Sequence, residues 1–324
     1  MSTGHFRRTA GIARHPEVGA ARRRLGVLAI FGPTASGKTA VAEAVADRLG
    51  GEVISADSMQ AYCGLPILTA QPERPTRLVG IWPLSHEGSV ADYATLAHAE
   101  IDALLEEGRT PVVAGGTGLY LRAALVELAL PPAPSPELRK RYESLYDRLG
   151  AERAHAALAD RDPEAAARLH ANDRRRVVRA LELTELGSSL RPQTDRLWAT
   201  DVRRPTIIFG LDIPRDVLTE RIAHRAGKMF DAGVVAEARA ALAEGISSTA
   251  VQALGLREVT ELARDEALEA LITRTRRYAA YQRKWMRRIP GLVSVKADRP
   301  ADEVADEIVQ VASARQRIPA GRAG

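Results

Sequence analysis

A glycine-rich loop with the sequence GPTASGKT holds the residues whose types and spacing are best suited to chemistry. It fits the pattern G-x-x-x-x-G-K-[ST], in which turn amides and the N-terminus of the following helix point at an anion. Lys38 adds a positive charge, and the hydroxyl of Thr39 can bind Mg²⁺. The sequence therefore predicts a site for a phosphorylated ligand, with Thr39 as the metal ligand. This site consists of Gly32, Pro33, Thr34, Ala35, Ser36, Gly37, Lys38 and Thr39.

Such a loop requires a strand before it and a helix after it, and the sequence provides both. Residues 25–31, LGVLAIF, form an apolar run with the length of a buried parallel strand. Beyond the loop, apolar residues recur at helical spacing until Leu49, and Gly50 and Gly51 end the pattern. Strand, glycine turn and helix are the context in which the motif binds phosphate.

Two later segments place further polar residues at strand ends. Residues 52–55 have the pattern of a buried strand that leads into a loop at Asp57, and Val112 and Val113 precede glycines and Thr117. Strands that alternate with helices indicate an α/β fold, with a P-loop-type parallel sheet core flanked by helices. Because ligands bind beyond the carboxyl ends of such strands, Lys38, Asp57 and Thr117 should converge on one crevice.

The composition restricts the possible classes of protein. The 324 residues include 46 Lys and Arg against 41 Asp and Glu, a formal charge of +5 that by itself favours a nucleic-acid partner only weakly. No apolar run approaches the ~20 residues of a membrane span, and the N-terminus lacks a signal-peptide stretch. Cys63 is the only cysteine, which excludes internal disulfides and cysteine-built zinc sites. We therefore expect a soluble, cytoplasmic protein that does not contact a membrane.

Changes in pattern divide the chain. Residues 1–24 are rich in arginine without apolar periodicity, so we expect a disordered basic N-terminal extension. Four prolines between Pro131 and Pro136 indicate a stiff linker, and a helical pattern follows from Glu137 to about Gly187. A buried-strand pattern returns at residues 204–214. We predict a catalytic core with C-terminal helices at 25–125 and 203–316, and a helical insertion at 126–202.

Two basic helical segments point to nucleic acid. In NDRRRVVRALEL, Arg175 and Arg179 are four residues apart and share a face, with Arg176 close to Arg179. The segment TRTRRYAAYQRKWMRR, residues 273–288, contains no acidic residue, and one helical stripe carries Tyr278, Tyr281 and Trp285. Guanidinium groups interleaved with aromatic rings are what an RNA surface requires. The alternative, that the aromatic residues pack inward and the charges form a solvated face, stays open at this point.

In seven segments and in the same order, the sequence resembles the tRNA dimethylallyltransferases, also called tRNA isopentenyltransferases. The resemblance runs from about Leu25 to Ile289, which is most of the chain. Its segments are GPTASGKT, ISADSMQAY, AGGTGLYLRA, DPEAAARLHANDRRRVVRALEL, RIAHRAGKMFDAGVVAEA, ALGLREV and TRRYAAYQRKWMRR. The resemblance implies a P-loop α/β core with a helical insertion that binds tRNA.

The resemblance also implies a reaction. A dimethylallyl group would pass from dimethylallyl diphosphate to N6 of the adenine 3′ of the anticodon in certain tRNAs, releasing pyrophosphate. Asp57 would accept a hydrogen bond or proton from the amine. Lys38, Thr39 with Mg²⁺, and Arg221 or Arg225 would stabilise the leaving group. We expect a monomer whose contacts to tRNA come from Asp57, Ser58, Met59, Gln60, Thr117, Arg175, Arg176, Arg179, Arg276 and Arg277.

The sequence departs from the family's pattern after the second motif. The usual stretch is close to YRGLDIGTAKP, whereas YCGLPILTAQP differs at Cys63, Pro66, Leu68 and Gln71. Residues 79–88, VGIWPLSHEG, stand where the family usually has a histidine pair, and we expect His86 to be an ordinary loop histidine. These differences concern local tRNA contacts and rate rather than the class of reaction.

Three alternatives remain open on the sequence. A P-loop small-molecule or nucleotide kinase also needs a phosphate loop and often a strand-end aspartate that organises Mg²⁺. An adenylate isopentenyltransferase would alkylate a free nucleotide by the same chemistry. An RNA-binding protein with a decayed active site is opposed by the intact Lys38, Thr39 and Asp57.

Overall fold

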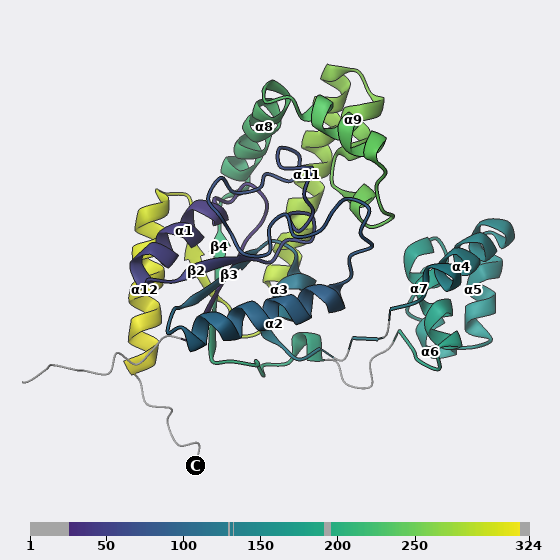
Figure 1. Cartoon of the computed structure of the whole chain (residues 1–324), viewed down its shortest axis with the longest axis horizontal. Coiled ribbons are helices and arrows are strands. Elements are labelled where there is room, and N and C mark those ends of the chain that lie inside the picture. The colour runs from purple at the N-terminus through teal and green to yellow at the C-terminus, as the bar shows by residue number, and fades with distance from the viewer. Residues whose placement is uncertain (1–25, 129, 132, 191–195, 318–324) are drawn as a thin grey trace, which may run out of the picture.

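Five parallel strands form the central sheet of the described residues, in the order β2-β3-β1-β4-β5. The computed structural model describes residues 26–128, 130–131, 133–190 and 196–317, so the extension expected at 1–24 lies outside it (Figure 1). The strands are β1 (Val27–Phe31), β2 (Glu52–Ser55), β3 (Pro111–Gly115), β4 (Thr206–Asp212) and β5 (Val293–Lys296). The predicted parallel sheet is confirmed, but β5 lies in a region that the sequence pattern predicts as mostly helical.

Helices cover both faces of the sheet because alternate residues of β1 point to opposite sides. Leu28 and Ile30 pack in the core beneath α1 (Lys38–Leu49) and α12 (Ala301–Arg317), which lie side by side (Figure 1). Phe31 belongs to the larger core on the other face. That core receives residues from α2 (Val90–Glu106), α3 (Gly118–Leu125), α8 (Arg215–Asp231), α9 (Val234–Glu244), α10 (Leu256–Glu261) and α11 (Arg264–Met286).

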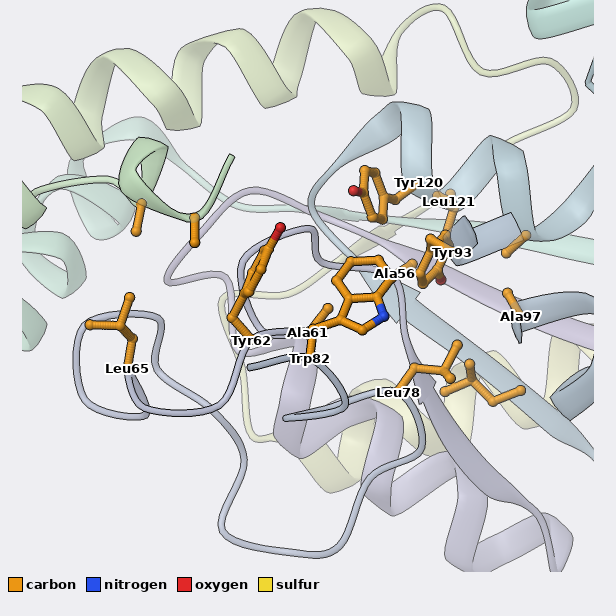
Figure 2. Packing of buried hydrophobic residues seen from close by; sticks show 14 of the residues in the cluster. Ala56, Ala61, Tyr62, Leu65, Leu78, Trp82, Tyr93, Ala97, Tyr120 and Leu121 are labelled. Atoms are coloured by element: carbon orange, nitrogen blue, oxygen red, sulfur yellow. The ribbon is translucent and has the colours of Figure 1, made fainter. Parts of the chain in front are cut away.

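The long connection between β2 and α2 is packed into this second core (Figure 2). Trp82 is 6% exposed, and its ring lies 5.5 Å from that of Tyr62 and 5.0 Å from that of His86. The Tyr62 hydroxyl accepts a hydrogen bond from the Gly88 amide at 3.0 Å. Of the positions that depart from the family's pattern, Leu68 therefore belongs to the core, whereas Cys63 and Pro66 are exposed. His86 packs against the Trp82 ring.

Four helices form a separate unit between α3 and β4 (Figure 1). They are α4 (Pro136–Leu149), α5 (Ala151–Ala159), α6 (Pro163–Ala166) and α7 (Arg174–Glu185). Tyr142, Leu158 and Val177 belong to a hydrophobic cluster that these helices share with no strand of the sheet. The side chains of Ser135, Asp162 and Asp173 cap α4, α6 and α7 by accepting a backbone N–H. Two short 3₁₀ segments, Arg196–Trp198 and Ala250–Gln252, lie outside this unit.

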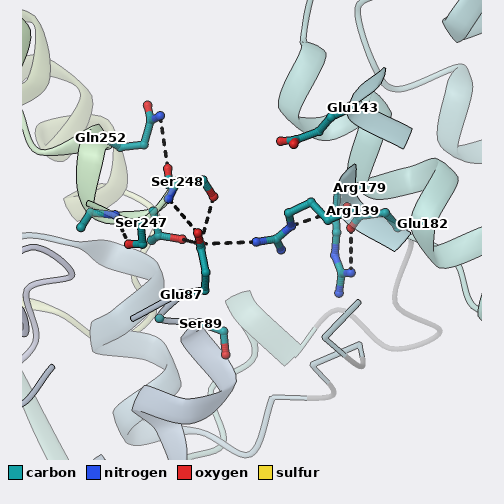
Figure 3. A network of polar contacts seen from close by, with 12 residues as sticks. Glu87, Ser89, Arg139, Glu143, Arg179, Glu182, Ser247, Ser248 and Gln252 are labelled. Carbon is teal, nitrogen blue, oxygen red and sulfur yellow. Dashed lines mark hydrogen bonds and ion pairs between the residues drawn. The ribbon is translucent and has the colours of Figure 1, made fainter. Parts of the chain in front are cut away.

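A chain of ion pairs connects the four-helix unit to the core (Figure 3). The carboxylate of Glu87 lies 3.7 Å from Arg139 Nη1, and Arg139 Nε lies 3.6 Å from Glu182 Oε1. Glu182 is only 2% exposed at its side chain and also pairs with Arg179 at 3.1 Å. On its other side Glu87 accepts hydrogen bonds from the amide and hydroxyl of Ser248. Glu87 thus holds a loop of the core and the inserted helices together.

Among the helices of the described residues, none combines the length and the apolar character that a membrane span requires.

Candidate active site

The loop between β1 and α1 has the geometry of a phosphate-binding turn. Gly37 has a φ of 86° and Ala35 a φ of 63°, and a residue other than glycine adopts such a value at a cost of about 1 kcal/mol or more. Ser36 is 1% exposed, and its Oγ has no hydrogen-bond partner among the described residues. A buried hydroxyl in that state costs free energy, as does the strained backbone. Both features suit a loop whose partner is an anion.

Lys38 lies at the first position of α1, directly after this loop. Its Nζ donates a hydrogen bond to the Pro33 carbonyl oxygen at 2.9 Å. Burial lowers the pKa of Lys38 to about 8, while the negative charge of Asp57 raises it and the positive charge of Arg225 lowers it. Lys38 is therefore mostly charged at neutral pH and available to an anionic ligand.

A cavity of about 410 Å³ lies at the carboxyl ends of β1, β2 and β3. The three segments predicted to converge all reach this cavity. Lys38 and Asp57 line it themselves, and the segment that contains Thr117 reaches it through Gly115. Of the residues predicted to form the site, the lining includes Thr34, Ala35, Gly37, Lys38, Thr39, Asp57, Gln60, Arg221 and Arg225. Gly32, Pro33 and Ser36 are buried within the loop itself.

Two arginines of α8 border the phosphate loop. Arg221 and Arg225 are four residues apart and share one face of the helix. The guanidinium of Arg225 donates a hydrogen bond to the Thr34 hydroxyl. Burial lowers the pKa of Arg225, and the charge of Asp57 opposes that shift. Both arginines line the cavity together with the phosphate loop.

The loop after β2 is ordered by short-range hydrogen bonds. Asp57 Oδ1 accepts the Met59 amide at 3.0 Å, and Thr117 Oγ1 accepts the Ser58 amide at 3.4 Å. The side chain of Gln60 accepts from the Ser55 hydroxyl at 2.9 Å and donates to the Ala70 carbonyl at 2.9 Å. Asp57 therefore has a fixed orientation beside the cavity, whereas Gln60 has its amide engaged within the protein.

Helix α11 contributes residues that the sequence analysis placed elsewhere or missed. For the aromatic stripe the sequence leaves open an RNA-facing surface and inward packing, and Tyr278 packs inward: it lines the cavity, with its hydroxyl 3.5 Å from Thr117 Oγ1. Burial raises the pKa of Tyr278 to about 12, so its hydroxyl is neutral. Trp285 packs against Gly118, where an added Cβ would lie 2.2 Å from the indole ring. Gln282 also lines the cavity, and its only sequence signal is a position four residues after Tyr278.

Comparison with known proteins agrees with this arrangement. A family model described as IPP transferase matches residues 60–289, and one described as isopentenyl transferase matches residues 25–77. A tRNA dimethylallyltransferase of Streptomyces griseus is 42% identical over 275 residues, which cover 81% of this chain and 87% of that protein. The chain belongs to the tRNA dimethylallyltransferase family.

Other members of the tRNA dimethylallyltransferase family show the same extent of similarity. One from Streptomyces avermitilis is 43% identical over 277 residues, covering 82% of this chain and 88% of that protein. The structure of a tRNA isopentenylpyrophosphate transferase from Bacillus halodurans superposes with a TM-score of 0.64 at 34% identity, covering 90% and 98% of the two chains. The P-loop-type fold implied by the resemblance is thereby confirmed.

The basic residues that the family resemblance assigns to tRNA have different surroundings on α7. Arg175 and Arg176 are both exposed, and Arg176 Nε lies 3.7 Å from Asp173 Oδ2. Arg179 is 23% exposed at its side chain and is paired with the buried Glu182. Arg179 therefore has a structural partner, which its position in the sequence does not reveal.

The basic segment of α11 is partly neutralised by acids from other elements. Arg274 pairs with Glu258, and Arg283 lies 3.5 Å from Asp212. Arg276 and Arg277 are exposed. The absence of acidic residues within the segment therefore overstates its positive charge in the folded protein.

The pKa of Lys38 predicts how the affinity of this protein for dimethylallyl diphosphate depends on pH. The charged form exists below about pH 8 and is lost above it, so the affinity of the free protein for dimethylallyl diphosphate should fall as pH rises through 8. We expect Kd to increase by up to tenfold per pH unit above that point. Titrations between pH 7 and 10 measure this, and a Lys38→Arg variant, which stays charged, serves as the control. A wild-type Kd that is flat across this range contradicts the assignment.

Proposed function

We propose that this protein transfers a dimethylallyl group from dimethylallyl diphosphate to N6 of an adenine in tRNA, at the position 3′ of the anticodon. The observation that carries the proposal is the shared cavity, because a phosphate loop and a carboxylate both line it. Family membership supports alkyl transfer rather than the kinase alternative.

The carboxylate of Asp57 has the role of base in this proposal. The exocyclic amine attacks the allylic carbon, the bond from that carbon to the diphosphate oxygen breaks, and the amine proton passes to Asp57. The hydrogen bond from the Met59 amide fixes the carboxylate while it acts. The adenine would leave its stack to enter this cavity, as other enzymes that modify bases require.

Charge that develops on the departing pyrophosphate is met by the loop and by α8. Lys38, Arg221 and Arg225 line the same cavity, and Ser36, whose hydroxyl has no partner among the described residues, belongs to the same loop as Lys38. Fixed donors of this kind stabilise a leaving group because they need no reorganisation as the charge forms.

The donor set also suits Mg²⁺. Thr39 is exposed at the start of α1 and lines the cavity, and the described residues contain no cluster of three His, Cys, Asp or Glu side chains that could hold a metal alone. The Thr39 hydroxyl would hold Mg²⁺ together with diphosphate oxygens. The ion would supply additional positive charge to the leaving group.

The acceptor distinguishes the proposed enzyme, which acts on tRNA, from an adenylate isopentenyltransferase, which acts on a free nucleotide. The four-helix unit and the exposed cations Arg175, Arg276 and Arg277 offer a large surface for an RNA backbone, which an adenylate isopentenyltransferase does not need. We propose that the protein acts as a monomer in the cytoplasm, and sedimentation with and without tRNA tests the monomeric state.

Incubation with labelled dimethylallyl diphosphate, with and without unmodified tRNA, tests the function directly. We expect label to enter tRNA, and adenosine monophosphate to remain unlabelled. Parallel incubations with γ-labelled ATP should show neither transfer nor hydrolysis. Consumption of ATP coupled to turnover would support the kinase alternative instead.

Single replacements of arginine should separate tRNA contacts from donor contacts. Arg276→Ala and Arg277→Ala are each expected to reduce the salt slope of tRNA binding by about 0.7 to 0.9, the value for one lost phosphate contact. KM for tRNA should rise while kcat stays near wild type, because the lost interaction is the same in ground and transition states. Arg221→Ala should lower kcat or raise the donor KM without changing the slope.

The control for these variants is Arg48→Ala on the opposite face of the sheet, where Arg48 pairs with Asp302 and Asp306 of α12. It should leave the slope unchanged. An unchanged slope in both α11 variants would remove this helix from the tRNA surface.

The Arg179→Ala variant on α7 should lose folding stability, because it leaves Glu182 with one partner fewer.

A further inference from the structure

Helix α11 contacts both substrate sites through its inner face. Thr275 and Gln282, spaced seven residues apart along the helix, are buried at 5% and 2% exposure. On the same stripe, Tyr278 and Trp285 face the third motif, so that three side chains of α11 contact three consecutive residues. The pairs are Gln282 with Gly116, Tyr278 with Thr117, and Trp285 with Gly118.

Gln282 makes the contact that joins two loops. Its Oε1 accepts the backbone N–H of Thr34 at 2.7 Å, and its Nε2 donates to the carbonyl oxygen of Gly116 at 2.9 Å. Thr34 belongs to the phosphate loop, and Gly116 precedes Thr117 in the loop on the adenine side. One buried amide therefore spans the two halves of the site.

The side-chain amide of Gln282 matches the chemistry of both partners. The Thr34 amide is a donor and the Gly116 carbonyl is an acceptor, so the bridging side chain must offer one group of each kind. A Cβ at position 116 would lie 2.2 Å from Gln282 Nε2, so glycine is needed there for the amide to enter. The Gln282 side chain and Gly116 are buried, so the Gly116 carbonyl depends on this amide for a partner.

The outer face of the same helix carries exposed cations. Arg276, Arg277 and Lys284 are exposed, and they lie within six residues of Gln282 along one continuous helix. A ligand that fixes the outer face also fixes the inner face, because a helix moves as a rigid element.

We propose that Gln282 is a positioning residue that couples the tRNA surface of α11 to the phosphate loop, so that bound tRNA raises the affinity of the donor site. The inference rests on the proposed function and adds a route between its two substrates. By linkage, the donor raises the affinity for tRNA by the same factor. Both groups of the Gln282 amide are bonded to the backbone, so it acts through the geometry of Thr34 and Gly116.

Donor binding to the full chain, with and without saturating tRNA, tests the coupling. The probe is the thiodiphosphate analogue of dimethylallyl diphosphate, which resists transfer, and Kd is measured in both states. In wild type we expect tRNA to lower the donor Kd at least about fivefold. In Gln282→Met, which keeps the volume and loses both hydrogen bonds, the donor Kd without tRNA should rise about tenfold. The ratio between the two states should fall close to one.

A purely structural role would raise both donor Kd values equally and leave the ratio unchanged. Gln282→Glu keeps an acceptor for Thr34 but has no N–H for Gly116, so its ratio should lie between those of wild type and Gln282→Met. This variant decides the question if Gln282→Met does not fold. Gln252→Met, at an exposed glutamine, is the matched control and should keep both values.

The inference is overturned if a folded Gln282 variant keeps the wild-type ratio, or if tRNA leaves the wild-type donor Kd unchanged. Either result can occur while wild type still transfers the prenyl group. Failure of the proposed function has a different signature, because wild type would then bind no donor or label no tRNA.

Discussion

Replacement of Asp57 by alanine is expected to lower kcat for prenyl transfer by about 100-fold or more, the range for removal of a general base. The carboxylate lines the cavity and is held by the Met59 amide, so its loss removes the proton acceptor without enlarging a hydrophobic core. Affinity for tRNA should change little. Single-turnover rates and tRNA Kd together provide the measurement.

The Asp57→Asn variant refines this test. Its amide oxygen still accepts from Met59 but cannot take a proton, so its kcat should fall as far as that of Asp57→Ala. Because the charge of Asp57 raises the pKa of Lys38, assays belong at about pH 7 or below, where Lys38 stays charged more completely. Near-normal turnover of Asp57→Asn would show that Asp57 orients the amine rather than removing its proton.

Lys38→Met is expected to reduce kcat/KM for dimethylallyl diphosphate by about 10²- to 10³-fold, the cost of removing one preorganised donor from a developing anion. The methionine retains most of the side-chain volume, so the loss is of charge and hydrogen bonding. The affinity for tRNA should be spared, because Lys38 lies in the cavity and not on the exposed basic surface.

A lysine outside the site is the control for this result. Lys296→Met changes an exposed lysine of β5 and should leave both donor use and tRNA binding unchanged. Reduced tRNA affinity in Lys38→Met with unchanged donor affinity would place Lys38 against RNA and contradict its role at the diphosphate.

Local sequence patterns were sufficient for the parts of the fold that depend on neighbours along the chain. The apolar runs at β1, β2 and β3 and the glycine turn before α1 each depend on a few adjacent residues. The β5 strand was missed because it has four residues, of which only Val295 is buried, so its pattern is too short to distinguish from a turn.

The sequence by itself determined that this chain has a phosphate loop, an aspartate at a strand end and the order of motifs that defines its family. The packing of α11 decided which further side chains contact the site. Tyr278 and Trp285 point inward to the third motif, and Gln282 bonds to residues 248 and 166 positions away. The packing of the inserted helices likewise gave Arg179 a buried partner in Glu182. Periodicity shows which residues share a face of a helix, but not what that face meets, because contacts between distant segments form only when the whole chain packs.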